Sequence, residues 1–127
     1  MNILITGGLG FIGGHFLTKI KNNKSFGKII VFDKMTYASN YNRLKNLFKK
    51  NNFFLFKGDI TYKSDVQYVF KMYKPNVVIN FAAESHVDNS INNPDLFLDV
   101  NIKGTLNLLN EAKKLWCGKD NKLKKEY

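Results

Sequence analysis

The chain has 127 residues, which fits one domain, and its 44% hydrophobic and 24% charged residues are ordinary for a globular protein rather than a disordered one. A net charge of +10 raises the question of a nucleic-acid partner, but all but one of the basic residues are scattered lysines, so we expect none. No apolar stretch reaches the roughly 20 residues of a membrane span, no signal peptide is indicated, and the single Cys117 excludes an internal disulfide, so the composition predicts a cytoplasmic protein.

Strands and helices are expected to alternate along most of the chain. Short apolar runs predict strands over residues 2–6, 28–33, 53–57 and 76–81. Helical spacing of apolar residues predicts helices over 11–20 and 42–50, and a third that Ser64 can cap and that runs to Tyr73. Pro94 can open a long helix that reaches about Trp116 and has a wide apolar face.

This alternation predicts βαβ units and an α/β fold, a Rossmann-like doubly wound parallel sheet. The strands are almost entirely apolar, as expected when helices cover both faces of a sheet. With about four strands the sheet would be incomplete, which would leave an edge strand and a helix face uncovered and favour self-association. We assign residues 1–116 to this truncated domain and 117–127 to a basic polar tail.

Gly7, Gly10 and Gly13 stand between the first strand and the first helix in a G-x-x-G-x-x-G pattern. In such a turn the glycines allow a tight bend, the approach of backbone N–H groups to a pyrophosphate, and close packing of helix on strand. Asp33 ends the second strand about 20 residues later, where a carboxylate can bind ribose hydroxyls and repel a 2′-phosphate. The pattern favours NAD over NADP, and Asp59 after the third strand can meet the adenine edge. The alternative is a glycine-rich turn and a capping aspartate in another α/β protein.

Longer segments carry a resemblance to a known family. Thr6–Gly13 resembles the fingerprint of the extended short-chain dehydrogenases/reductases. Asp33-Lys-Met-Thr-Tyr-Ala38 and Ala82-Ala-Glu-Ser-His-Val-Asp-Asn-Ser-Ile91 narrow the resemblance to the dTDP-glucose 4,6-dehydratases, and Asn101-Ile-Lys-Gly-Thr105 continues it. The Ala82–Ile91 stretch is the specific part, because sugar-nucleotide epimerases generally differ there. The resemblance covers essentially the whole chain.

The resemblance implies NAD as cofactor, held by the glycine turn, the ends of the strands and the long helix. The implied cofactor-binding residues are Gly7, Gly10, Phe11, Ile12, Gly13, Asp33, Lys34, Met35, Thr36, Asp59, Ile60, Phe81, Ala82, Ala83, Ser85 and Val100. Ser85, His86 and Asp88 are expected beside the sugar nucleotide, without a role in proton transfer. Two positions depart from the family pattern: Asn89 replaces an arginine, and Gly14 stands where serine is common.

No catalytic residue is assigned. In the family a tyrosine and a lysine four residues later perform the redox chemistry, and the resemblance places this pair beyond residue 127, together with the acid and base of the dehydration. Tyr41 and Lys45 have the same spacing, but they follow Asp33 too closely to reach a nicotinamide. We therefore expect the chain alone not to turn over dTDP-glucose, the substrate implied for the complete enzyme, which is also expected to be a homodimer. No metal site is expected, because the two histidines and Cys117 lie far apart in the sequence.

Three other interpretations stay open at this stage. The chain could be the front part of another sugar-nucleotide epimerase or dehydratase. It could be a non-catalytic NAD-binding or interaction module whose long helix packs on a partner. The basic charge leaves a nucleic-acid binder as the remaining alternative.

Overall fold

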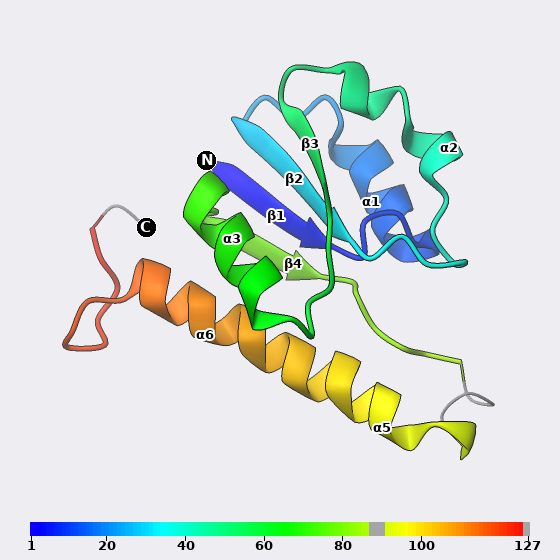
Figure 1. The fold of residues 1–127 in the computed structure, drawn as a ribbon. Helices are drawn as coiled ribbons and strands as arrows, with labels where there is room; N and C mark the ends of the chain where they lie inside the picture. Colours follow the sequence, from blue (N-terminus) through cyan, green and yellow to red (C-terminus); the bar gives the residue numbers. More distant parts are fainter. Residues whose placement is uncertain (87–90, 126–127) are drawn as a thin grey trace.

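The computed structural model describes residues 1–86 and 91–125. Within them, four parallel strands form one sheet in the order β3-β2-β1-β4 (Figure 1). Helix α1 covers one face of the sheet, and α3 and α6 cover the other (Figure 1). The strands are β1 (Asn2–Thr6), β2 (Lys28–Asp33), β3 (Phe53–Lys57) and β4 (Val77–Asn80), and the main helices are α1 (Phe11–Ile20), α3 (Lys63–Tyr73) and α6 (Thr105–Trp116). The predicted α/β fold with a parallel sheet of about four strands is confirmed.

Two hydrophobic clusters lie on opposite faces of the sheet because successive strand residues point to opposite sides. Ile3 and Ile5 of β1 belong to the cluster under α1, which also contains Leu17. Leu4, between them, belongs to the cluster under α3 and α6 together with Val69 and Leu108. Strand β1 pairs with β2 and with β4, so both of its faces and both of its edges are covered. The cavity described below forms at the end of this central strand.

Strand β4 is at the edge of the sheet. Its residues are only partly buried, and Asn80 at its end is exposed, whereas four of the five residues of β1 are fully buried. The fourth strand had been predicted over 76–81 and is two residues shorter. The two flanking residues still bond to β1: the side chain of Asn76 accepts a hydrogen bond from the backbone of Asn2, and the backbone N–H of Phe81 donates to the carbonyl of Thr6 at 3.1 Å.

The predicted helix over 42–50 is wrong as a single element. It is divided into a short helix α2 (Tyr41–Leu44) and a 3₁₀ turn η1 (Leu47–Lys49). The side chain of Asn40 accepts a hydrogen bond from the backbone of Arg43 and caps α2, which therefore begins at Tyr41, one residue before the predicted start. Leu44 is buried at its end, and the chain then turns toward β3.

The expected Ser64 cap of α3 is also wrong, because the helix begins at Lys63 with Tyr62 in the cap position. The carboxylate of Asp65, in the first turn, instead accepts a hydrogen bond from the backbone of Asp59. This bond holds the N-terminal end of α3 against the loop that follows β3.

The long helix from Pro94 to Trp116 forms as three consecutive parts: α5 (Pro94–Phe97), a π-helical segment η2 (Leu98–Gly104) and α6. Pro94 occupies the first turn as predicted, and the side chain of Asn93 caps it. The π-helical segment was not predicted. A Cβ atom at Gly104 would lie 2.6 Å from the side chain of Ile60, so the helix approaches the β3 loop closely at this point. Such π-helical turns are frequent at functional sites.

After Trp116 the chain folds back on the end of α6. Cys117 and Leu123 form an isolated antiparallel bridge, and the backbone N–H of Lys124 donates to the carbonyl of Trp116 at 2.8 Å. The domain boundary expected at residue 116 stays a prediction. No helix in the described part of the chain has the length and apolar character needed to cross a membrane.

Candidate functional site

A cavity opens at the carboxyl ends of the strands. At this edge of the sheet β1 lies between β2 and β4 (Figure 1). The empty space between the walls of the cavity is about 630 Å³, including the part that is open to solvent. The chain crosses from the β2 side of β1 to the β4 side at this point, and ligands of open parallel sheets bind where the strand order reverses in this way. The cavity is lined by Gly7, Gly10, Phe32, Asp33, Lys34, Thr36, Ala38, Ser39, Gly58, Asp59, Ile60, Phe81, Ala82, Ala83, Glu84 and Val100.

The glycine turn forms the floor of the cavity and has no room for side chains. Gly7 has a positive φ of 61°, and a Cβ atom there would lie 2.5 Å from the backbone nitrogen of Ala82. A Cβ atom at Gly13 would collide with the carbonyl oxygen of Gly7, so this glycine lets α1 pack against the turn. The backbone N–H of Gly10 donates to the same carbonyl at 3.1 Å and closes the turn.

Helix α1 begins directly after this turn. Gly10 stands at its N-cap, no side chain caps it, and its first turn contains no acidic residue. The partial positive charge of the helix N-terminus is therefore not neutralised by the protein's own side chains. Uncapped N-termini that follow a glycine turn bind phosphate groups.

Asp33 is buried at the end of β2 and orders the loops on both sides of it. One carboxylate oxygen, Oδ2, accepts a hydrogen bond from the backbone N–H of Leu9 at 2.9 Å. The other, Oδ1, accepts from the backbone N–H of Met35 at 2.8 Å and from the hydroxyl of Ser39 at 2.7 Å. An ionised carboxylate has about four acceptor positions. Asp33 lines the cavity and retains acceptor capacity on Oδ2 for a ligand.

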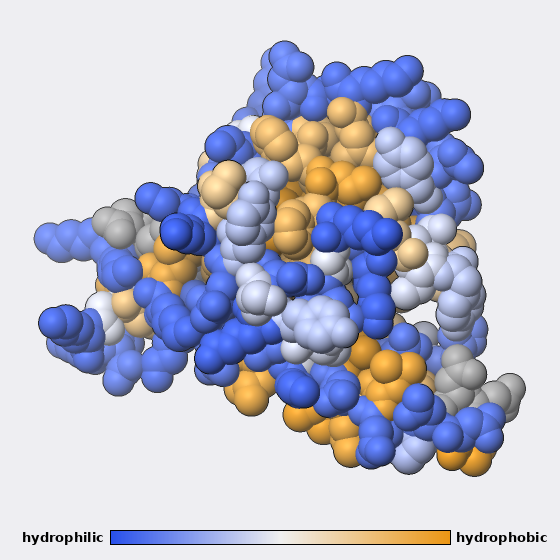
Figure 2. Space-filling view, viewed as in Figure 1, coloured by the Kyte–Doolittle hydropathy of each residue, from blue (hydrophilic) through white to orange (hydrophobic). Residues whose placement is uncertain are grey.

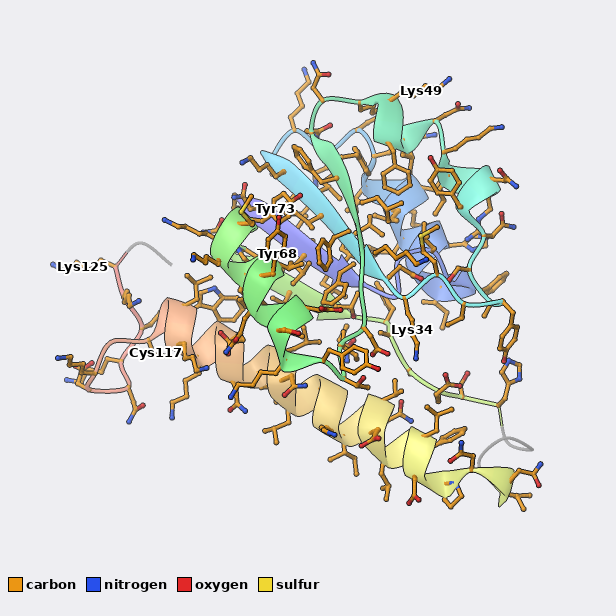
Figure 3. The ribbon with its side chains drawn as sticks, in the orientation of Figure 1. Lys34, Lys49, Tyr68, Tyr73, Cys117 and Lys125 are labelled. Carbon is orange, nitrogen blue, oxygen red and sulfur yellow. The ribbon has the colours of Figure 1, made fainter. Side chains whose placement is uncertain are left out.

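Lys34 and Asp59 join the ends of β2 and β3 through an ion pair of 2.8 Å. Figure 3 shows Lys34 beside the chain that leaves β3. Burial alone would raise the pKa of Asp59, but hydrogen bonds from Lys34 and from Thr61, with the charge of Lys34, hold this pKa below its usual value. The hydrogen bond to Asp59 raises the pKa of Lys34, against the opposing effect of its burial. Both groups are therefore charged at neutral pH.

The loop after β4 forms the opposite wall and is held at two points. The hydroxyl of Thr6 accepts a hydrogen bond from the backbone of Ala82 at 3.3 Å and donates to Asn80. The side chain of Asn101, in the π-helical segment, bonds to both backbone groups of Glu84, each at 2.9 Å. These bonds fix the loop between β4 and the long helix.

Most of the residues expected at the cofactor come together around this cavity. Those that line it are Gly7, Gly10, Asp33, Lys34, Thr36, Asp59, Ile60, Phe81, Ala82, Ala83 and Val100. Gly13 lies buried behind the turn, and Met35 packs toward the hydrophobic cluster under α1. Phe11 and Ile12 are exposed at the start of α1, and Ser85 is exposed outside the cavity.

Two of the expected substrate-side residues, Ser85 and His86, lie further along the same loop and are exposed. The ring of His86 contacts that of Tyr37, with centroids 5.9 Å apart. Asp88, and with it the Asn89 departure, lies outside the described residues.

Five lining residues were not predicted: Phe32, Ala38, Ser39, Gly58 and Glu84. Each is a sequence neighbour of a predicted one or falls in the same loop. Ser39 had a usable signal, because a hydroxyl shortly after a strand-ending aspartate can bond to that carboxylate.

Tyr41 and Lys45, which have the spacing of a catalytic pair, do not line the cavity. Tyr41 stacks on Phe48, with ring planes 7° apart. His15 lies on α1, where Nδ1 is 2.9 Å from the carbonyl oxygen of Phe11. Within the described residues, no group of three His, Cys, Asp or Glu side chains could hold a metal ion.

The fold and the site define the class of dinucleotide-binding Rossmann folds. The defining features are a glycine turn between a parallel strand and a helix, an acidic residue that ends the next strand, and a cavity where the strand order reverses. The chain belongs to the GDP-mannose 4,6 dehydratase family, whose sequence model matches residues 4–125.

Individual relatives confirm the resemblance drawn from the sequence. The dTDP-glucose 4,6-dehydratase of Salmonella typhimurium is 40% identical over 96% of this chain. A crystal structure of dTDP-glucose 4,6-dehydratase from Bacillus anthracis in complex with NAD is 38% identical and covers 90% of the chain with a TM-score of 0.76. The UDP-glucose 4-epimerase of Thermus thermophilus in complex with NAD is 28% identical over 91% of the chain, with a TM-score of 0.77.

The chain spans only about a third of the length of these relatives. It covers 34% of the Salmonella enzyme and 34% of each of the two crystallised chains.

Proposed function

We propose that this chain is the N-terminal, NAD-binding part of a nucleotide-sugar 4,6-dehydratase that converts dTDP-glucose to dTDP-4-keto-6-deoxyglucose when complete. The observation that carries the proposal is the cavity built from the glycine turn, Asp33 and Asp59 at the reversal of strand order. The names of the dehydratases to which the chain is similar supply the substrate class. The epimerase alternative is weaker, because the epimerase is less similar in sequence than the dehydratases.

The residues present fit a dinucleotide. The missing Cβ atoms at Gly7 and Gly13 let the turn pack tightly against the loop after β4 and against α1, and the uncapped start of α1 supplies a favourable charge for a diphosphate. Asp33, Lys34 and Thr36 would surround the adenosine ribose, and Asp59 and Ile60 the adenine. The segment Phe81–Ala83 and Val100 would lie toward the nicotinamide.

The protein's own groups in the cavity bind and orient rather than transfer protons. When bound, NAD supplies a hydride acceptor and donor. Among the described residues that line the cavity there is no tyrosine, histidine or cysteine. Asp33 accepts hydrogen bonds from backbone donors, Asp59 is paired with Lys34, and both carboxylates are assigned to binding the adenosine. We therefore propose that the 127 residues alone do not turn over the sugar nucleotide.

Two further elements of the proposal concern the surroundings of the site. Ser85, His86 and Asp88 are proposed to face the substrate. The apolar face of the long helix is proposed to take part in a homodimer, because Figure 2 shows hydrophobic side chains gathered along it and four of them are at least half exposed: Leu98, Ile102, Leu106 and Leu109. The single cysteine favours a reducing, cytoplasmic location.

Calorimetric titration of NAD into the purified chain tests the cofactor site. Asp33→Ala should abolish binding, because it removes the acceptor that orders the glycine turn and the loop after β2. Asp120→Ala, in the tail, is the matched control and should bind as the wild type does. A wild-type chain that gives a folded circular dichroism spectrum and no heat of binding would contradict the proposal.

A second experiment separates a dehydratase segment from a non-catalytic NAD-binding module. The remaining two thirds of a homologous dehydratase are added in trans, with dTDP-glucose as substrate. Formation of the 4-keto-6-deoxy sugar supports the dehydratase assignment. Bound NAD without turnover in the mixture would favour the non-catalytic module.

A further inference from the structure

The only arginine of the chain reaches across to the glycine turn. Arg43 lies in α2, and its guanidinium Nη2 donates a hydrogen bond to the carbonyl oxygen of Gly10 at 3.1 Å. Gly10 is the N-cap of α1, so this bond is made at the end of the helix that faces the cavity. Arg43 itself does not line the cavity.

Gly14 makes this contact possible. A Cβ atom at Gly14 would collide with the guanidinium nitrogen of Arg43 and lie 3.0 Å from its central carbon. Gly14 does not have a positive φ, so a side chain there would compete with the guanidinium for space and would not strain the backbone. A serine side chain at this position would displace the guanidinium. Gly14 and Arg43 therefore act as a pair.

The backbone around Arg43 is anchored to the same turn from a second side. The backbone N–H of Asn40 donates to the carbonyl of Leu9 at 2.8 Å, and the side chain of Asn40 accepts from the backbone N–H of Arg43 at 3.1 Å. The next residue, Leu44, is buried under α1. The exposed guanidinium thus extends from a fixed base, which lowers the entropy cost of holding it on Gly10.

The bond from Arg43 acts on the peptide unit that joins Gly10 to Phe11. A cationic donor on the carbonyl polarises this unit and makes its N–H, which belongs to the first residue of α1, a stronger donor. The charge of Arg43 also adds to the partial positive charge at the helix N-terminus. Both effects favour an anion in front of α1.

We propose that Arg43, admitted by Gly14, is a positioning residue of the cofactor site that holds the glycine turn and strengthens its attraction for the diphosphate. This inference rests on the proposed NAD binding. It predicts that Arg43 matters for ligands with phosphate groups and not for the nucleoside alone.

The test compares the affinities of the chain for NAD, ADP and adenosine by calorimetry. Arg43→Ala should weaken binding of NAD and ADP about two- to fivefold, the size of an exposed charge effect at a helix N-terminus, and leave adenosine unchanged. Arg43→Lys should restore part of the affinity. Lys45→Ala removes the same charge from an exposed neighbour and is the matched control, with affinities like the wild type.

A double-mutant cycle tests the pair. Gly14→Ser should weaken ADP binding in the wild-type background and have no further effect in the Arg43→Ala background. Equal ADP affinities for Arg43→Ala and Lys45→Ala would overturn the inference. So would a loss of adenosine affinity in Arg43→Ala as large as its loss of ADP affinity. Either result would leave the proposed NAD binding in place. A wild-type chain that binds neither NAD nor ADP overturns both.

Discussion

Substitution of Gly7 by alanine is the most direct perturbation of the cavity floor. At this position φ is 61°, and the added methyl group would lie 2.5 Å from the backbone nitrogen of Ala82 and 2.6 Å from the carbonyl carbon of Phe81. Both atoms belong to backbone and cannot rotate away. The loop after β4 must therefore shift, and it forms one wall of the cavity.

The expected loss of stability has two parts. Left-handed backbone costs a non-glycine residue roughly 1–2 kcal/mol. Moving a packed backbone segment costs on the order of another 1–3 kcal/mol, the range of overpacking in a core. The total of about 2–5 kcal/mol corresponds to a decrease in Tm of about 6 °C or more for a domain of this size.

Gly27→Ala is the matched control, because a methyl group at Gly27 would meet its nearest neighbour at 3.6 Å, an ordinary contact. Thermal unfolding and NAD titration are measured for both variants. Gly7→Ala should unfold at a lower temperature and fail to bind NAD, whereas Gly27→Ala should resemble the wild type in both assays. Equal Tm and equal NAD affinity for the two variants would refute the role assigned to this turn.

Three further predictions concern other parts of the site and surface. Because Asp59 has a lowered pKa in the folded chain, its ion pair with Lys34 stabilises the fold above the usual aspartate pKa near 3.8 and loses this effect as the pH falls through the folded-state pKa. Asp59→Asn should thus cost under about 1 kcal/mol at pH 7, since Lys34 is half exposed, and less at pH 2, as measured by chemical unfolding at both pH values. A cost that persists unchanged at pH 2 would contradict this. Asn101→Ala removes both bonds to Glu84 and should weaken NAD binding about threefold or more while leaving ADP binding unchanged, because it loosens only the wall assigned to the nicotinamide; an equal loss for both ligands would refute that assignment. Ile102→Glu should lower the mass measured by light scattering from dimer to monomer, whereas Met72→Glu, at a similarly exposed apolar position on α3, should not. Identical masses for the two variants would exclude the proposed interface.

The sheet could be predicted closely from the sequence because its signals are local. Strands β1, β2 and β3 have the predicted bounds, since each is an apolar run that stops at a glycine or a charged residue. Helix α1 begins and ends as predicted because the glycine turn precedes it and its apolar spacing is clear. The prediction of one helix over 42–50 failed because Leu44, Leu47 and Phe48 have helical spacing, yet two short turns also bring them to the core, where Leu44 is buried and the other two are partly buried.

The sequence predicted most of the residues around the cavity but not the hydrogen bonds that hold them. Asp33 was expected to serve the ribose, but its strongest visible role is to accept hydrogen bonds from Leu9, Met35 and Ser39. The contact from Arg43 to Gly10 joins residues 33 positions apart in the chain and has no signal in either segment alone. The close approach of Gly104, at the end of the π-helical segment, to Ile60 is likewise a contact of tertiary packing that neither segment signals alone.

Trp116 makes a hydrogen bond next to the sheet, so its fluorescence can serve as a probe of the fold. The indole N–H of this single tryptophan donates to the carbonyl of Pro75 at 2.7 Å, at the amino end of β4 and so at the opposite end of the sheet from the cavity. Its fluorescence reports whether α6 is docked on the sheet. Emission that changes on unfolding and stays constant on filling the cavity would let stability and ligand binding be followed separately in one sample.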